Sequence, residues 1–406
     1  MSIFRKEQAQ TVKWPDREID YRHVDVVDGI RGMAVVFVLW FHFWQQTWFM
    51  PEYRTPFLAF VGIDSLTPTN LRWVGYLFVD MMVLLSAFCL GLPLARHIIL
   101  GEGMDDACTF YKKRFARIYP SYLLGVLVSF GYQLYTGHYP TVSFAVRDLV
   151  SHLTFTHMLR ADTYIYTPIN GVLWTVALEV WFYVLFPVFA RLFKKSPLLF
   201  FLALTGLGGW YIFGYSLSHP PVNMQVNQFP TFLPVFATGM LGAYLFTLYC
   251  VKVSCKGWLG LVFTGVWVLS VIWLHRELTD CRCFSEDKQI WQLQNRIRLG
   301  WCFGLFLVSA ALSVKPIRWL FSNPLARFLG GISYNLYIYH QRLMVLLRMS
   351  LGFQSGADVA AAGTKMQVFL SVEALVLSLL IAAVLTYLWE RPWRQWILKD
   401  RTKKED

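Results

Sequence analysis

Long apolar segments recur along the whole chain and constrain its fold more than any other feature. We identify ten segments of about 17–25 residues, the length that crosses the hydrocarbon core of a bilayer as an α-helix. They lie near 29–49, 73–93, 118–136, 171–190, 197–216, 230–250, 257–275, 297–314, 329–350 and 366–389. Hydrophobic residues make up 56% of the chain and charged residues only 15%, which excludes an ordinary soluble domain. The sequence therefore predicts an all-α fold, a polytopic membrane helical bundle of about ten transmembrane helices.

Basic residues are distributed unevenly between the segments that connect these helices. If the N terminus is cytoplasmic, 25 of the 37 Lys and Arg residues fall on the cytoplasmic side, which is the positive-inside pattern. We therefore expect both termini to be cytoplasmic, in a multi-pass protein of the cytoplasmic membrane. The net charge of +12 follows from this pattern and does not predict binding to nucleic acid. The expected organisation is a cytoplasmic segment over 1–28, a transmembrane domain over 29–389 and a cytoplasmic tail over 390–406.

The first apolar segment contains two ionisable residues, Arg31 and His42. Eleven residues are about three helical turns, so both lie on nearly the same face, with His42 roughly 16 Å further from the cytoplasm. An arginine at that place is also explained as an interfacial anchor. A histidine in the outer half of the membrane also occurs as a hydrogen-bond partner of a neighbouring helix, but ionisable groups at this depth favour a functional role.

Three other segments place ionisable residues at the same depth, namely Asp80, Glu179 and His340. Thr175 lies one turn from Glu179 on the same face. A charged side chain alone in hydrocarbon costs on the order of 2.5–3.5 kcal/mol. We therefore expect these groups and His42 to converge on one polar cavity, the alternative being a structural hydrogen-bond cluster between helices.

A second basic feature precedes the third segment, where Arg114 and Arg117 are one helical turn apart. The positive-inside pattern accounts for such a cluster without further function. Two guanidinium groups on one helical face also suit a bidentate grip on phosphate, which predicts an anion site.

Five segments in order resemble the membrane-bound acyltransferase family 3. The first helix of that family carries an arginine, ten residues and a histidine, matched here by Arg31 and His42. Its other elements resemble KRFARIYP, LWTVALEVWFYVLFP, SYNLYIYHQRL and WERPWRQW in this chain. The chain also departs from the family pattern. Its second helix reads VDMMVLLSAF, with Ala87 in place of a glycine, and Thr175 stands where serine is commoner.

The resemblance implies transfer of an acyl group, most often acetyl, from cytoplasmic acyl-CoA to a hydroxyl of a glycan or related cell-envelope molecule. In this reaction acetyl-CoA would be the donor substrate and a glycan would be the acceptor. The protein would lie in the lipid bilayer, and no metal is expected. The predicted catalytic residues are His42, Glu179, Thr175, His340 and Asp80, and the predicted donor-binding residues are Arg31, Arg114 and Arg117.

The residue chemistry is compatible with that reaction. A neutral imidazole at His42 can accept a proton from an attacking hydroxyl, and Glu179 can orient that imidazole or position the acceptor. The arginines would hold the phosphates of the donor. A proton-coupled transporter is the main alternative, because carriers also place carboxylates and histidines within the membrane. A scaffold or sensor without chemistry is a third possibility.

Overall fold

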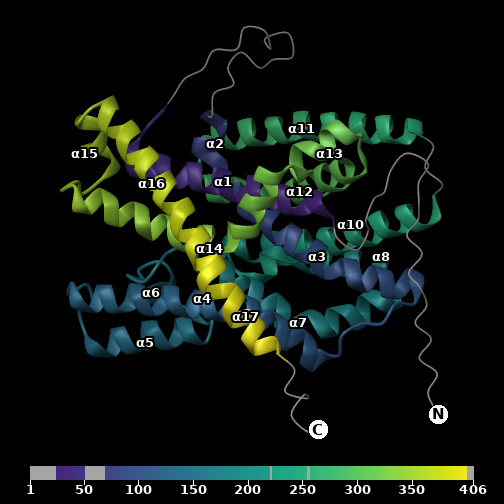
Figure 1. Cartoon of the computed structure of the whole chain (residues 1–406), viewed down its shortest axis with the longest axis horizontal. Coiled ribbons are helices and arrows are strands. Elements are labelled where there is room, and N and C mark those ends of the chain that lie inside the picture. Colours follow the sequence, from purple (N-terminus) through teal and green to yellow (C-terminus); the bar gives the residue numbers. More distant parts are fainter. Residues whose placement is uncertain (1–23, 51–68, 220–221, 254–256, 400–406) are drawn as a thin grey trace.

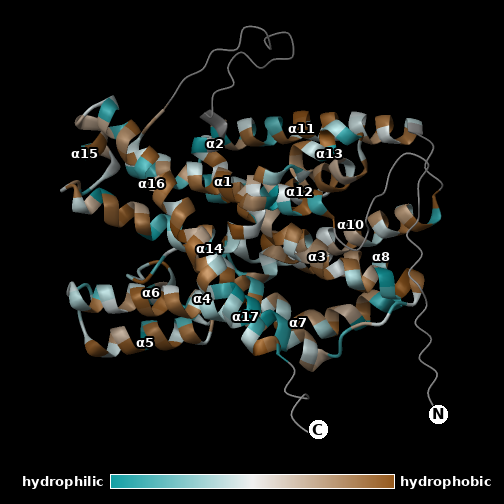
Figure 2. Ribbon diagram, in the orientation of Figure 1, coloured by the Kyte–Doolittle hydropathy of each residue, from teal (hydrophilic) through white to brown (hydrophobic). Residues whose placement is uncertain are grey.

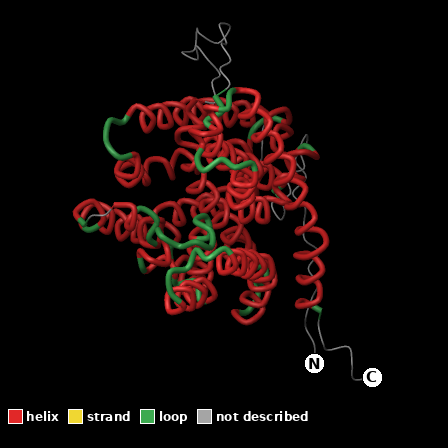
Figure 3. Tube along the Cα trace, turned by 90° about the vertical axis from the view of Figure 1, so that its left-hand side faces the viewer, coloured by secondary structure: helices red, strands yellow, loops and turns green. Residues whose placement is uncertain are grey.

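The computed structural model describes residues 24–50, 69–219, 222–253 and 257–399, and this part of the chain consists of helices and loops without a strand (Figure 3). The all-α prediction is thereby confirmed. Of the expected cytoplasmic segments, residues 1–23 and 400–406 lie outside the described part of the chain.

Each predicted apolar segment is helical, as Figure 1 shows. The long helices are α1 (Asp25–Thr47), α3 (Phe78–Leu100), α4 (Ala107–Tyr135), α7 (Trp174–Lys195), α8 (Pro197–Gly214), α10 (Leu233–Lys252), α11 (Gly257–Cys283), α12 (Lys288–Leu312), α14 (Pro324–Ser350) and α16 (Thr364–Val384). The short ones are α2 (Thr69–Val74), α5 (Val142–Leu153), α6 (Ala161–Tyr164), α9 (Val222–Gln225), α13 (Lys315–Ser322), α15 (Gly356–Ala361) and α17 (Arg391–Leu398). A π-helical turn over Leu385–Glu390 joins α16 to α17.

Seven helices of the described residues are long and apolar enough to cross a membrane. The number is eight if α12 and α13, which are bent by 111° relative to each other, form one span. The fold is thus a polytopic bundle, and the count of ten remains a prediction. The two helices that do not meet the same criteria are α4 and α14, which carry Arg114, Arg117 and His340.

The helices differ in how much of their surface faces the surroundings. Most residues of α3 and α10, which pack along each other, are buried. In contrast few residues of α8, α11 and α16 are buried, and these helices present large exposed apolar side chains such as Leu199, Leu269 and Leu380. Figure 2 shows hydrophobic colour along these outer helices and hydrophilic colour on α17. An apolar exterior of this extent is what lipid contact requires.

Helices α1 and α14 touch at their backbones, at a point where only glycine leaves enough room. A Cβ added at Gly330 would lie 2.1 Å from the carbonyl oxygen of Asp28, and one added at Gly32 would lie 2.8 Å from the nitrogen of Gly330. Small residues allow such close helix packing in membranes. Ten residues beyond this contact, α1 carries His42 and α14 carries His340.

Candidate active site

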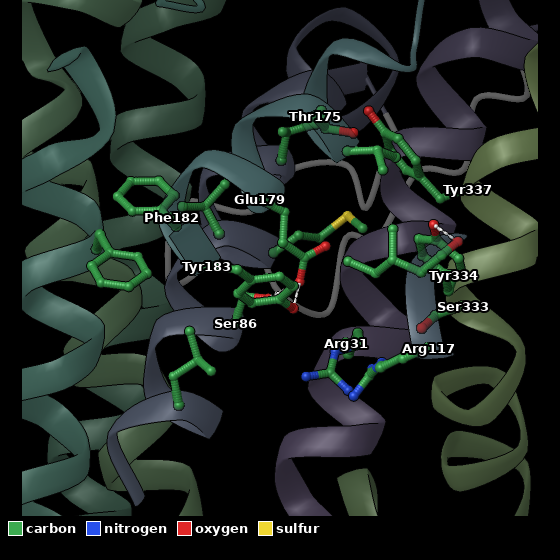
Figure 4. Close-up of a pocket in the computed structure, with 17 residues that line it drawn as sticks. Arg31, Ser86, Arg117, Thr175, Glu179, Phe182, Tyr183, Ser333, Tyr334 and Tyr337 are labelled. Atoms are coloured by element: carbon green, nitrogen blue, oxygen red, sulfur yellow. Dashed lines mark hydrogen bonds between the residues drawn. The ribbon is translucent and has the colours of Figure 1, made fainter. Parts of the chain in front are cut away.

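A cavity lies at the centre of the bundle, between α1, α3, α4, α7, α10 and α14. Its empty volume, counted with its mouth, is about 780 Å³. Polar side chains from five of these helices line it, as Figure 4 shows: Arg31, Ser86, Arg117, Thr175, Glu179, Tyr183, Ser333, Tyr334 and Tyr337. The structure therefore brings together four of the eight predicted site residues, Arg31, Arg117, Thr175 and Glu179.

Glu179 is the carboxylate of this cavity, and α7 presents it five residues after the helix begins. One of its oxygens accepts hydrogen bonds from the hydroxyl of Ser86 on α3 and from that of Tyr183, which is 2.5 Å away. Tyr183 follows Glu179 by four residues and so shares its helical face. The other carboxylate oxygen points into the cavity (Figure 4). Neutral hydroxyl donors thus fix the carboxylate while one oxygen remains available.

Two arginines face Glu179 from the opposite side of the cavity in Figure 4. The guanidinium of Arg31 donates to the sulfur of Cys89 at 3.2 Å and lies 3.5 Å from a carboxylate oxygen of Asp28. Arg117 lines the same cavity from α4. The cavity therefore holds positive charge at one end, against a carboxylate.

Arg114 does not line this cavity but an adjoining one, which we call the basic vestibule and define by His97, Arg114, Arg191 and Lys194. Its empty volume, counted with its open side, is about 1010 Å³. Leu90 lines both spaces, so the vestibule adjoins the central cavity. The guanidinium of Arg114 lies 5.4 Å from the ring centre of Tyr183, a cation–π contact.

His42 and His340 form a pair of rings next to the central cavity, with centroids 5.1 Å apart. The ring of His340 lies 5.7 Å from that of Tyr337, whose hydroxyl is directed toward Thr175 in the cavity (Figure 4). Gln45 lies 3.0 Å from Nδ1 of His42. Nδ1 of His340 donates to the carbonyl oxygen of Tyr337 at 2.7 Å, which leaves its buried Nε2 without a partner.

The described contacts do not join Glu179 to His42, whereas orienting that imidazole was one of the two roles that the sequence suggested for Glu179. The partners of Glu179 are Ser86 and Tyr183, whereas the Nδ1 of His42 contacts Gln45 and Gln341. The two groups therefore lie at different places along one path, with Thr175 and Tyr337 between them.

Asp80 lies elsewhere, in a fully buried ion pair with Arg296 of α12 at 3.0 Å. Its second oxygen accepts from Gln292 at 3.2 Å. The guanidinium of Arg296 also donates to Thr231 at 2.6 Å and lies 4.0 Å from the ring centre of Phe232. Asp80 therefore joins α3 to α12 and to the segment before α10, and it does not line the central cavity.

Sequence reasoning missed several residues of the site. The positive-inside pattern accounts for Arg191 and Lys194 without a site, although their place at the C-terminal end of the Glu179 helix was a usable signal. Tyr183 could have been found four residues after Glu179. Arg296 precedes the eighth predicted segment by one residue and carried no signal of its own. Among the described residues, no group of three or more His, Cys, Asp or Glu side chains could hold a metal ion.

Comparison with known proteins decides the family. The profile of a family described as an acyltransferase domain, acyltransferase family 3, matches residues 24–389. The chain belongs to this family. The protein is accordingly an acyltransferase, which favours an enzyme over the transporter that embedded charges also allow.

Two relatives of this acyltransferase agree with the assignment. The ORF330 protein of Acidianus two-tailed virus, whose name marks it as a candidate acetyltransferase, is 25% identical over 336 residues, 82% of this chain and 87% of the relative. The acyltransferase MdmB of Streptomyces mycarofaciens is 30% identical over 171 residues, 42% of this chain and 40% of the relative. No solved structure matches the chain.

Proposed function

We propose that this acyltransferase moves an acetyl group from cytoplasmic acetyl-CoA to a hydroxyl of an extracytoplasmic or lipid-linked glycan. The observation that carries the proposal is a continuous arrangement of three parts. The basic vestibule adjoins the cavity that holds Glu179, and that cavity ends at Tyr337, whose ring neighbours the histidine pair. A donor with an anionic end and a reactive end matches this order.

The donor phosphates bind in the basic vestibule in this proposal. Arg114, Arg191 and Lys194 come from two helices and face one space, and guanidinium and ammonium groups are the usual partners of phosphate. From there the pantetheine arm runs past Leu90 into the central cavity, where Arg31 and Arg117 lie. The thioester then lies near Glu179.

The acceptor hydroxyl approaches from the histidine end. A proton on Nδ1 of His42 satisfies the contact with Gln45 and leaves Nε2 as a proton acceptor. The hydroxyl oxygen attacks the thioester carbon and gives its proton to His42, with the unpaired Nε2 of His340 as a second acceptor beside it. The C–S bond then breaks, the proton returns to the leaving thiolate, and the products are an O-acyl ester and free CoA.

Thr175 and Asp80 support this reaction in different ways. Thr175 and Tyr337 place hydroxyl groups at the point where the cavity meets the histidine pair, which suits them to hold the acceptor. Asp80 supports it only through the fold: its ion pair with Arg296 holds α3, the helix that supplies Ser86 to Glu179.

The test uses the purified protein in liposomes with acetyl-CoA and envelope glycans, analysed by mass spectrometry. We expect transfer by the wild type and no transfer by His42→Ala, which retains donor binding. Arg114→Gln and Lys194→Gln should each weaken acetyl-CoA binding, measured by thermal stabilisation, by about 10-fold, because a hydrogen bond to a charged group contributes about 1.5–3 kcal/mol. Near-normal turnover of His42→Ala would refute its role. If acetyl-CoA did not raise the thermal stability of the wild-type protein, its assignment as the donor would be wrong.

A further inference from the structure

Apolar side chains line the central cavity beside its polar groups. Six of them, from α3, α7 and α10, we call the apolar pouch: Val79, Met82, Val83, Val176, Phe182 and Phe236. Figure 4 shows Phe182 at the edge of the cavity that lies away from Arg31 and Arg117. The ring of Phe182 is therefore remote from the two cations of the cavity.

Two stacked rings close the pouch. The rings of Phe182 and Phe236 are parallel within 2°, with centroids 4.0 Å apart, and the side chains are 2% and 0% exposed. Further rings support each of them from behind: Phe229 lies 4.6 Å from Phe182, and Phe189 lies 5.9 Å from Phe236. Because interiors packed in this way do not deform freely, the pair forms a firm wall.

The position of this wall relative to Glu179 indicates what the pouch holds. Phe182 follows Glu179 by three residues on α7, so the carboxylate and the ring share one helical face. A group bound there meets polar side chains at one end and only apolar ones at the other. A glycan hydroxyl would lose its hydrogen bonds in such a pouch, whereas an acyl thioester has a polar carbonyl followed by an apolar chain.

We infer that the apolar pouch receives the acyl chain of the donor and that the stacked rings of Phe182 and Phe236 limit its length to short acyl groups. This inference rests on the proposed function and adds the residues that select the acyl group. Phe182 and Phe236 are specificity-determining residues in this view, since they contact the chain and not the reacting carbonyl.

The test compares turnover with acetyl-, propionyl-, butyryl- and hexanoyl-CoA in the liposome assay. Phe182→Leu and Phe236→Leu shorten the wall and keep an apolar side chain, so the core remains filled better than with alanine. Val176→Leu fills the pouch instead. The matched control is Phe193→Leu, the same substitution at a fully buried position of α7 that does not line the cavity.

The wild type should use acetyl-CoA best, with kcat/KM falling as the chain lengthens. Either wall variant should raise the ratio of butyryl to acetyl turnover by about 10-fold, because each buried methylene changes the free energy by about 0.8 kcal/mol, or roughly fourfold. Val176→Leu should lower that ratio, and Phe193→Leu should leave it unchanged.

Three results would overturn the inference. Wall variants with an unchanged chain-length profile would contradict it while leaving the proposed function intact. A changed KM for the glycan without a changed profile would assign the pouch to the acceptor. Absence of transfer from every acyl-CoA by the wild type would overturn the proposed function and the pouch together.

Discussion

Glu179 and Asp80 are two carboxylates at similar depth in the sequence-predicted membrane, and the structure gives them opposite surroundings. Glu179 is held by the neutral hydroxyls of Ser86 and Tyr183, with one oxygen open to a cavity. Asp80 is fully buried against Arg296, with an amide on its second oxygen. The partners of the two carboxylates therefore distinguish their roles. Glu179 is available for chemistry, whereas Asp80 holds helices together.

The comparison shows why membrane depth alone does not identify a catalytic residue. A buried ion pair satisfies its charges internally, and loss of one partner leaves the other uncompensated. A carboxylate held by neutral donors has no counter-charge within its own hydrogen bonds, so it can interact with a substrate. Substitutions at the two positions should accordingly affect different properties.

Among substitutions at and around the two carboxylates, the largest effect is expected for Glu179→Gln. The amide keeps the size of the side chain and can still accept from the two hydroxyls, but it removes the negative charge from the cavity. We expect acyl transfer to fall on the order of 10²–10⁴-fold, with the midpoint of thermal unfolding in detergent close to that of the wild type. A large loss of thermal stability with normal turnover per folded molecule would instead give Glu179 the structural role that we assign to Asp80.

Asp80→Asn should destabilise the protein by about 3–5 kcal/mol, because Arg296 remains buried without its counter-charge. The measurement is thermal unfolding, together with turnover per folded molecule, which should remain close to the wild-type value. The double variant Asp80→Leu with Arg296→Met should regain most of the stability, since an apolar pair often replaces a buried ion pair without loss. A catalytic role for Asp80 would instead leave the double variant stable and inactive.

The smallest effects should come from the groups that hold each carboxylate. Ser86→Ala removes one donor to Glu179 and should slow transfer by about 10- to 100-fold, because a hydrogen bond to a charged group contributes about 1.5–3 kcal/mol. Gln292→Ala, its counterpart beside Asp80, should lower the unfolding midpoint and leave transfer unchanged. Equal effects of both variants on transfer would place the two carboxylates in one functional unit.

The helices and half of the site were predictable from the sequence because they depend on local periodicity. The length of the apolar segments predicted where the helices lie. Helical spacing predicted the depth of Arg31 and Glu179, and both line the cavity. Depth does not give the direction in which a side chain points around the helix axis. Asp80 was therefore expected beside Glu179, although its partner Arg296 lies 216 residues further along the chain.

The basic vestibule was missed for a related reason. Arg191 and Lys194 contribute to the positive-inside pattern, and that pattern explains them before any site is considered. Only the packing of α3, α4 and α7 shows that they share a space with Arg114. A sequence alone does not distinguish a basic residue that sets the membrane orientation from one that binds a ligand.

The backbone contact between α1 and α14 has a mechanical consequence. Gly32 and Gly330 fix the axial register of the two helices, and each helix reaches its histidine ten residues later, about 15 Å along its axis. The distance from glycine to histidine is the same in both helices. If one helix moved along the other, the two imidazole rings would therefore be displaced from each other by the same distance. The glycine contact therefore determines how His42 and His340 are aligned, although it lies about three helical turns away from the two imidazoles.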